Sequence, residues 1–260
     1  MVSPGQPEAT PEVKPKVLLN ELSPFQRVIV VEEAGMRVLR FDALSGNDQS
    51  SFDPLHPDRV VFEYVRLAGL AVRLVKQPRR ALVVGLGGGA FPRLLLGCDA
   101  RLQVDVVELD PVVVDAARRF FDLPTSPRLQ VYEGDGVSFL ARVRAGYDIV
   151  LLAAFSGDGI PPSLTSKAFF HDARRALADG GVAVLNIALV SPAEMALIIE
   201  RFADAFRGCV VVTGKAEENR ILFGSRVPVS VDEVRLAAQR PTPALGYDAQ
   251  ADVDDVRPCP

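Results

Sequence analysis

The feature that most constrains the fold is the stretch from Arg80 to Gly136, in which three short apolar runs each end in glycine or in a carboxylate. The runs are Ala81–Val84, Val104–Val107 and Leu129–Tyr132, and the segments that follow them are Gly85–Ala90, Glu108–Pro111 and Glu133–Gly136. Short apolar runs bounded by turn residues are typical of buried strands in a parallel sheet. In such sheets, ligands bind beyond the carboxyl ends of the strands, where the strand order reverses. The stretch therefore predicts a parallel α/β sheet with a ligand pocket at one end of its strands.

The residues after the three runs have the chemistry that a nucleoside requires. Glycines permit positive φ angles and close approach of a ligand to the backbone, and the next helix begins there with free N–H groups. Glu108 can accept from both hydroxyls of a ribose, because an ionised carboxylate is only an acceptor. Asp135 is placed to accept from an exocyclic amine, which suits adenine. The candidate nucleoside-binding residues of this stretch are Gly85, Gly87, Gly88, Glu108, Asp110, Asp135 and Gly136.

The glycine string also fits a dinucleotide fingerprint, formed by Gly85, Gly87 and Ala90 with Glu108 at the expected distance. NAD is therefore an alternative ligand, and turn glycines with surface acids are a third interpretation. The fingerprint alone has low specificity. The glycine string, the acidic end of the second run and the Gly-Asp-Gly at 134–136 together favour S-adenosylmethionine or a relative.

Composition excludes several classes of partner and site. The chain of 260 residues is 48% hydrophobic, and its net charge of −4 includes no block of basic residues, so neither nucleic acid nor an anionic membrane is expected to bind. Three cysteines and two histidines show no metal-site spacing, and we expect no metal. Cys98 and Cys209 are interpreted as small apolar residues in or beside the core. Residues 1–16 contain no apolar segment of a signal peptide, and the apolar run 149–155 is too short to span a bilayer, so the sequence predicts a soluble, cytoplasmic protein.

The predicted organisation is one large α/β domain behind a small β region. Residues 1–16 are rich in proline and predicted to be disordered, residues 17–57 form a small N-terminal β region, residues 58–240 form the nucleoside-binding domain, and residues 241–260 form a mobile acidic tail. Runs at 28–31 and 36–41 flank a Gly-containing turn and predict a β-hairpin, with a loop at 42–57.

Within the large domain, strands and helices alternate. An apolar stripe predicts a helix over 59–75, and Ser163 or Thr165 is expected to cap a helix that Gly180 and Gly181 close. The fold class is α/β: a doubly wound, mostly parallel, seven-stranded Rossmann-like sheet of the class I methyltransferase-like type.

The order of these motifs resembles the spermidine synthase (polyamine aminopropyltransferase) family. The resemblance covers about residues 22–223, and it includes Ser23-Pro24-Phe25-Gln26, the glycine string, Val107–Pro111, Gly134–Gly136 and Tyr147-Asp148. It implies a small N-terminal β domain, dimers formed through that domain, and a pocket for decarboxylated S-adenosylmethionine as co-substrate. It also implies that Gln26 and Glu108 hold the nucleoside sugar, that Asp135 holds the adenine, and that a small amine accepts an aminopropyl group.

Three segments depart from the family pattern that the resemblance implies. The aspartate within the family's glycine string is Gly88 here, and the family's Tyr-His-Glu corresponds to Phe62-Glu63-Tyr64. The two aspartates of the family's catalytic loop, the first of which is the expected base, correspond to Ala153 and Ser156. Alanine cannot accept a proton, so the reaction does not follow from the resemblance alone.

Asp158 is the candidate replacement base, because it lies in the same loop, and its alternative role is that of a turn aspartate before Gly159. Glu63 is a second candidate, with an ion pair on a helix face as its alternative role, and Asp148 is interpreted as structural. Three functions stay open: a divergent aminopropyltransferase-like enzyme that uses S-adenosylmethionine or its decarboxylated form, an S-adenosylmethionine-dependent methyltransferase, and a nucleoside-binding homologue without catalysis. Gly88 favours acceptance of intact S-adenosylmethionine, since an aspartate there would repel its carboxylate.

Overall fold

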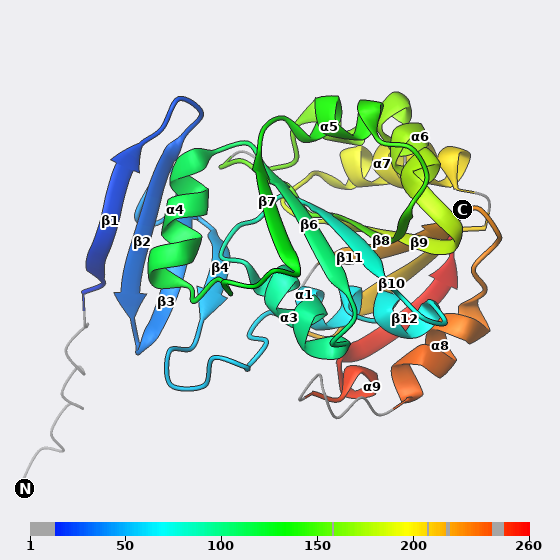
Figure 1. The fold of residues 1–260 in the computed structure, drawn as a ribbon, viewed down its shortest axis with the longest axis horizontal. Coiled ribbons are helices and arrows are strands. Elements are labelled where there is room, and N and C mark those ends of the chain that lie inside the picture. The colour runs from blue at the N-terminus through cyan, green and yellow to red at the C-terminus, as the bar shows by residue number, and fades with distance from the viewer. Residues whose placement is uncertain (1–13, 158, 207, 217–218, 241–246) are drawn as a thin grey trace, which may run out of the picture.

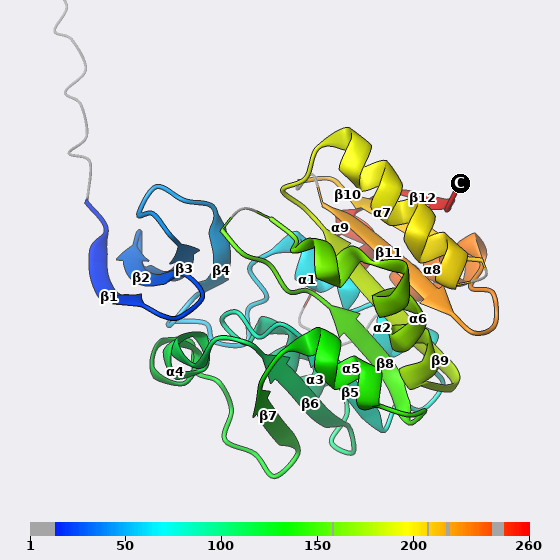
Figure 2. The ribbon, with the colours of Figure 1, turned by 90° about the horizontal axis from the view of Figure 1, so that it is seen from above.

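The computed structural model describes residues 14–157, 159–206, 208–216, 219–240 and 247–260, and it contains two β-sheets. Figures 1 and 2 show the smaller sheet beside the larger α/β unit, with helix α4 (Pro111–Phe120) lying between them. Among the described residues, no helix has the length and apolarity needed to cross a membrane. The prediction of disorder for residues 1–16 falls largely outside the described residues, although Lys16 already belongs to a strand.

The small sheet is antiparallel and has the order β1-β2-β3-β4. Its strands are β1 (Lys16–Leu22), β2 (Arg27–Glu33), β3 (Met36–Phe41) and β4 (Asp48–Phe52). Strands β2 and β3 are the predicted hairpin. The predicted loop over 42–57 is wrong for β4, in which Ser50 and Phe52 alternate inward. A small polar residue occupies one of these buried positions, so the sequence shows no apolar alternation there.

The large sheet has the order β12-β10-β11-β9-β8-β5-β6-β7. Its strands are β5 (Arg80–Val84), β6 (Gln103–Glu108), β7 (Leu129–Glu133), β8 (Tyr147–Leu152), β9 (Leu177–Ile187), β10 (Val210–Gly214), β11 (Arg220–Ser225) and β12 (Val253–Pro258). The strands from β9 to β7 are parallel, whereas β11, β10 and β12 are antiparallel to their neighbours. The predicted doubly wound α/β class is therefore confirmed. The order reverses between β5 and β8, which is where such sheets bind ligands.

Helices cover both faces of the large sheet. The first buried cluster packs one face against α1 (Glu63–Ala68), α2 (Ala71–Leu74), α3 (Ala90–Cys98), part of α4 and α8 (Val231–Gln239). The second cluster packs the other face against α5 (Gly136–Arg142), α6 (Lys167–Ala176) and α7 (Pro192–Ala205). Helix α4 also joins the two sheets, because Val113 and Ala116 pack with Val28, Val30 and Leu39 of the small sheet.

Two helix predictions are corrected. The predicted helix over 59–75 is divided at Gly69 and Leu70 into α1 and α2, and Tyr247 packs so close to Gly69 that a side chain there would not fit. Ser166, rather than Ser163 or Thr165, caps α6 by accepting from Phe169 N at 3.2 Å, after a short 3₁₀ turn over Pro162–Thr165. The two glycines at 180–181 lie inside β9, where its register with β8 shifts, and do not close a helix.

The C-terminal segment also differs from the predicted tail. Residues 241–246 lie outside the described residues, but Ala249–Asp252 form helix α9 and Val253–Pro258 form β12 at the edge of the large sheet. The acidic sequence of residues 253–258 does not indicate a strand, because only Val256 of the six residues is buried. An edge strand needs little apolar content, since one side of it faces solvent.

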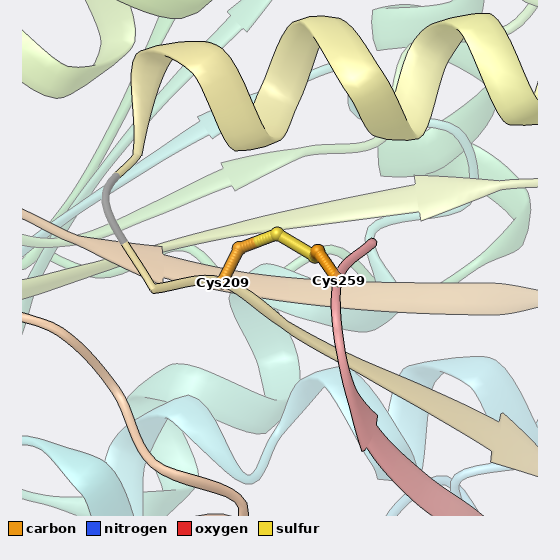
Figure 3. Close-up of a disulfide and its surroundings, with 2 residues drawn as sticks. All are labelled: Cys209 and Cys259. Atoms are coloured by element: carbon orange, nitrogen blue, oxygen red, sulfur yellow. A yellow bond between two sulfur atoms is a disulfide. The ribbon is translucent and has the colours of Figure 1, made fainter.

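A disulfide joins Cys209 to Cys259 (Figure 3). Cys209 is buried, as the sequence interpretation expects, but it is half of a cystine and not a free apolar side chain. Cys98 is free and partly buried among the residues of the first cluster. Spacing could not predict the pairing, because 50 residues separate the two cysteines and the strands that align them were not both recognised.

Candidate functional site

The segment after β5 forms a tight loop against the segment after β8. Gly85 has a φ of 94°, and a Cβ built on it would lie 2.7 Å from the Ala153 carbonyl oxygen and 2.7 Å from the Ala154 Cα. Its N–H donates to the Val107 carbonyl oxygen at 2.9 Å, which fixes the loop to the end of β6. Only glycine satisfies both the backbone conformation and the close approach.

Alanine at Gly85 should therefore destabilise the fold through a steric contact as well as through backbone strain. Gly35 is a matched control, because its φ is 79° and nothing lies within 4 Å of a Cβ there. Gly85→Ala should lower the free energy of unfolding by about 1–3 kcal/mol more than Gly35→Ala does. Urea unfolding of the two variants measures this difference. Equal losses would show that the contact with the segment after β8 is not tight.

Glu108, at the end of β6, connects two loops through its carboxylate. Oε2 accepts from Leu86 N at 2.7 Å, and Oε1 accepts from Asp110 N at 2.9 Å. Burial raises the pKa of Glu108 above its ordinary value of 4.5, although the two backbone hydrogen bonds act in the opposite direction. The carboxylate is thus held in position between the glycine loop and the start of α4.

Asp135 lies after β7 and caps helix α5. It accepts from Val137 N at 3.2 Å, from Ser138 N at 3.0 Å and from Ser138 Oγ at 2.7 Å. Partial burial opposes its ionisation, but these hydrogen bonds outweigh burial, and the pKa of Asp135 falls below its ordinary value. The side chain is exposed, so its carboxylate is ionised and accessible to a ligand at neutral pH.

Asp110, two residues after Glu108, has a carboxylate that accepts from groups of the protein itself. It is 1% exposed, and its oxygens accept from Val112 N at 2.9 Å and from Ser23 Oγ at 2.6 Å. It therefore caps α4 and connects that helix to the turn before β2. Gln26 closes the same turn, since Ser23 N donates to its carbonyl oxygen at 2.9 Å.

A cavity of about 300 Å³ lies at the carboxyl ends of β5, β6, β7 and β8. It brings together most of the predicted nucleoside-binding residues: Gln26, Gly85, Gly87, Glu108, Asp110, Asp135 and Gly136. Because neighbouring strands lie about 4.8 Å apart, Asp135 after β7 and Ala153 after β8 are separated by about three strand spacings. Asp135 and the segment after β8 thus lie at opposite ends of one cavity, with Glu108 between them.

Gly88 does not line this cavity among the described residues. Its N–H donates to Ser50 Oγ at 2.8 Å, and a Cβ there would lie 2.8 Å from Phe121 Cδ1 and 2.9 Å from Ser50 Cβ. Phe121 and Ser50 therefore pack directly against Gly88, and its role in holding the nucleoside stays a prediction. An aspartate at this position would meet these groups, so the lack of a side chain here also has a packing reason.

The end of the cavity beside β8 is lined by Ala153, Ala154, Phe155 and Ser156. Ser156 Oγ donates to the Gly159 carbonyl oxygen at 3.1 Å within this loop. Asp158, the predicted base, lies outside the described residues. Lining residues from other elements that were not predicted from the sequence include Phe41, Gln49, Ser50, Tyr64 and Phe91. Of these residues, only Tyr64 belongs to a segment that the resemblance had indicated, namely residues 62–64.

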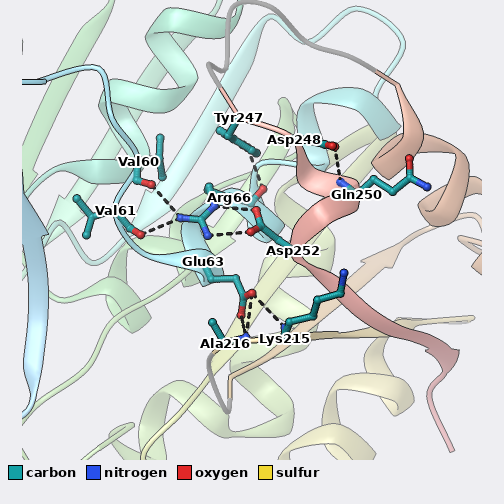
Figure 4. A network of polar contacts seen from close by, with 10 residues as sticks. All are labelled: Val60, Val61, Glu63, Arg66, Lys215, Ala216, Tyr247, Asp248, Gln250 and Asp252. Atoms are coloured by element: carbon teal, nitrogen blue, oxygen red, sulfur yellow. Dashed lines mark hydrogen bonds and ion pairs between the residues drawn. The ribbon is translucent and has the colours of Figure 1, made fainter.

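Two other carboxylates lie outside the cavity's described lining. Glu63 is 3% exposed and accepts from Lys215 N and Ala216 N, each at 3.0 Å, so it secures the turn after β10 from inside the fold (Figure 4). The interpretation as an ion pair on a helix face missed these backbone contacts. Asp148 Oδ2 accepts from Arg79 N at 2.7 Å and Arg80 N at 3.0 Å, which confirms its structural role at the start of β8.

A larger cleft of about 780 Å³ lies beside α3, and neither Glu108 nor Asp135 is among its described lining residues. Arg59, Arg93, Arg118, Asp58 and Asp122 are among its lining residues, so charges of both signs are mixed along it. Arg93 donates to the Gly88 carbonyl oxygen at 2.9 Å and thereby supports the glycine loop from behind. The smaller cavity is the better candidate site, because it contains the strand ends and the ordered carboxylates.

Comparison with known proteins gives consistent matches. Residues 62–205 match the family model described as the spermine/spermidine synthase domain. The polyamine aminopropyltransferase of Vibrio vulnificus is 32% identical over 175 residues, which cover 65% of this chain and 58% of that protein. The polyamine aminopropyltransferase of Neisseria meningitidis is 28% identical over 232 residues, which cover 87% of each chain. The crystal structure of a probable spermidine synthase from Corynebacterium glutamicum has the same fold, with a TM-score of 0.71, 19% identity, and coverage of 85% of this chain and 86% of that one.

Proposed function

This chain belongs to the spermine/spermidine synthase family, and from that premise we propose that it binds decarboxylated S-adenosylmethionine and transfers the aminopropyl group to a small amine. The observation that carries the proposal is the position of Glu108 and Asp135 at the ends of β6 and β7, in one cavity with the glycine loop. Glu108 would accept from the ribose hydroxyls, and Asp135 would accept from the adenine amine. Backbone N–H groups at the start of α3 would face the same ligand.

The strand order supports a proposal for the two ends of the cavity. With the nucleoside over β6 and β7, the sulfonium would lie toward β5, and the acceptor amine would enter beside β8. In the reaction, the amine lone pair attacks the carbon beside the sulfonium, the carbon–sulfur bond breaks, and methylthioadenosine leaves as a neutral thioether. The nitrogen loses one proton. Alkylamines have pKa values near ~10, so a group that removes this proton increases the reactive fraction.

Asp158 is our proposed acceptor of that proton, because it lies two residues after Ser156 in the loop that follows β8. Ala153 and Ser156 line the cavity but offer no basic group. We therefore propose a slow transferase in which Asp158 substitutes for the family's base.

Calorimetric binding and product analysis test the proposal together. The protein is titrated with decarboxylated S-adenosylmethionine, S-adenosylmethionine, methylthioadenosine and S-adenosylhomocysteine, and the products formed from a panel of amines are identified by mass spectrometry. Binding of the decarboxylated donor with aminopropylated product supports the proposal. Methylated product from S-adenosylmethionine would assign a methyltransferase, and binding without any product would assign a noncatalytic nucleoside-binding protein.

Replacing Glu108 tests the nucleoside site directly. Glu108→Ala should weaken methylthioadenosine affinity by at least ~10-fold, because the ribose hydroxyls lose a charged acceptor. Glu133→Ala is the matched control, since Glu133 is an exposed carboxylate at the end of the neighbouring strand and does not line the described cavity. Unchanged affinity in a folded Glu108→Ala protein would refute the assignment.

The affinity should also depend on pH. Because burial raises the pKa of Glu108, protonation removes its ionised acceptor at a higher pH than for an exposed glutamate, whereas Asp135 stays ionised. Methylthioadenosine affinity should therefore fall as the pH is lowered from ~8 toward ~5. Glu108→Gln should flatten this profile. A profile that is identical in wild type and Glu108→Gln would assign the titration to another group.

A further inference from the structure

Residues 247–259 form a segment, called here the C-terminal strap, that crosses α1 and then pairs with β10 at the sheet edge (Figures 1 and 4). Asp252 forms a two-point ion pair with Arg66 of α1, at 2.7 Å to Nε and 2.9 Å to Nη2. Tyr247 Oη donates to the Arg66 carbonyl oxygen at 2.8 Å. The strap thus holds both the side chain and the backbone of one residue of α1.

The same contacts connect the strap to the turn after β10. The Asp252 carbonyl oxygen accepts from Lys215 N at 3.1 Å, and Glu63 of α1 accepts from that N–H at 3.0 Å. Arg66 Nη1 donates to the Val60 and Val61 carbonyl oxygens at 3.0 and 2.8 Å, which fixes the segment before α1 as well (Figure 4). Polar contacts therefore position helix α1 from several directions. The strap supplies those of Asp252 and Tyr247 with Arg66.

Helix α1 also reaches the candidate site. Tyr64 lines the cavity, and its ring lies 5.5 Å from the ring of Phe62 and 6.0 Å from that of Phe91, measured between centroids. Phe91 lines the cavity too. A displacement of α1 would therefore move an aromatic wall of the site.

The strap is fastened at its end by the disulfide. Cys259 N donates to the Cys209 carbonyl oxygen at 2.9 Å, and the two side chains are covalently joined (Figure 3). In β12 only Val256 is fully buried, and Val253 packs partly buried against the same cluster, so few apolar contacts hold this strand. Cys209 is 3% exposed, whereas Cys259 is partly exposed, so a reagent reaches the Cys259 sulfur first.

We propose that Cys209–Cys259 is a reversible thiol–disulfide site at which a dithiol reductant releases the strap, loosens α1 and weakens binding in the cavity. One thiolate of the reductant attacks the Cys259 sulfur, and Cys209 leaves as a thiolate that takes up a proton. The second thiolate of the reductant attacks its own mixed disulfide, and Cys259 leaves and is protonated. The reductant ends as a disulfide and the protein gains two thiols, so electrons and protons balance.

Hydrogen–deuterium exchange on the full chain tests the proposal, with dithiothreitol as the reductant. In the reduced protein, amides of α1 and β10 should exchange about tenfold faster or more than in the oxidised protein, while those of β6 should not change. Cys98→Ser should show the same redox response, and Cys259→Ser without reductant should match the reduced wild type. Equal exchange in oxidised and fully reduced wild type would overturn the proposal, as would three free thiols in air-exposed protein.

Ligand affinity gives a second readout. Methylthioadenosine should bind about fivefold more weakly, or worse, after reduction. Unchanged affinity despite faster exchange in α1 would overturn the link between the strap and the cavity. If methylthioadenosine binds to neither form, the proposed function fails, whereas the exchange experiment still decides whether the disulfide controls the strap.

Discussion

Putrescine should be a poor acceptor, with a turnover well below the ~1 s⁻¹ at the lower end of ordinary enzymes, even when decarboxylated S-adenosylmethionine is saturating. Ala153 and Ser156 line the cavity beside the proposed acceptor position, and neither side chain can act as a base near neutral pH. A diamine near neutral pH is mostly protonated, and loss of a positioned base typically costs about 10²–10⁴ in rate. Mass spectrometric detection of the aminopropylated product measures the rate directly.

Two variants and one control make this expectation specific. Ala153→Asp should raise the turnover, because it places a carboxylate in the cavity beside the acceptor. Ala145→Asp is a control of equal charge at an exposed position outside the cavity's described lining. Asp158→Asn should remove any residual activity if Asp158 accepts the proton. A wild-type turnover of ~1 s⁻¹ or above would contradict the prediction. If that turnover also survived Asp158→Asn, the base would have to be sought outside this loop.

Reduction of the disulfide should lower the free energy of unfolding by about 4 kcal/mol, the value that chain entropy gives for a loop of this length. The loop joins residues separated by 50 positions, so opening it adds many conformations to the unfolded chain. Urea unfolding with and without dithiothreitol measures the change. Cys98→Ser should keep the full redox difference, because Cys98 is free. A difference below ~1 kcal/mol would mean that strain in the folded state, or residual structure in the unfolded state, cancels the entropic effect.

The central strands could be predicted because strands buried on both faces appear in the sequence as unbroken apolar runs. Glu108 and Asp135 followed from this, since a residue that directly follows such a strand lies at the ligand end of the sheet. The sheet was predicted to have seven strands, whereas β12 adds an eighth at its edge. The family resemblance is confirmed by the match over residues 62–205.

The sequence was less informative where a position depends on groups far away in the chain. Phe121 and Ser50 pack against Gly88 from other elements, which the glycine string does not indicate. Nothing near Asp110 in the sequence indicates that Ser23, 87 positions away in the chain, donates to one of its oxygens. Strands β4 and β12 were missed for another reason. Their inward-facing positions include few large apolar residues, so period-two alternation is absent from the sequence.

The position of β12 has a consequence for the protein's behaviour in concentrated solution. Strand β10 has Val210, Val211 and Val212 almost fully buried, and β12 pairs with its outer backbone edge. The edge that faces solvent instead carries Asp254, Asp255 and Arg257, whose charges oppose pairing with a second copy. Without β12, an apolar strand with unpaired N–H and C=O groups would become the edge of the sheet, and such edges are templates for intermolecular β-aggregation. By pairing with β10, the charged C-terminal strand thus also prevents β10 from pairing with a strand of a second molecule.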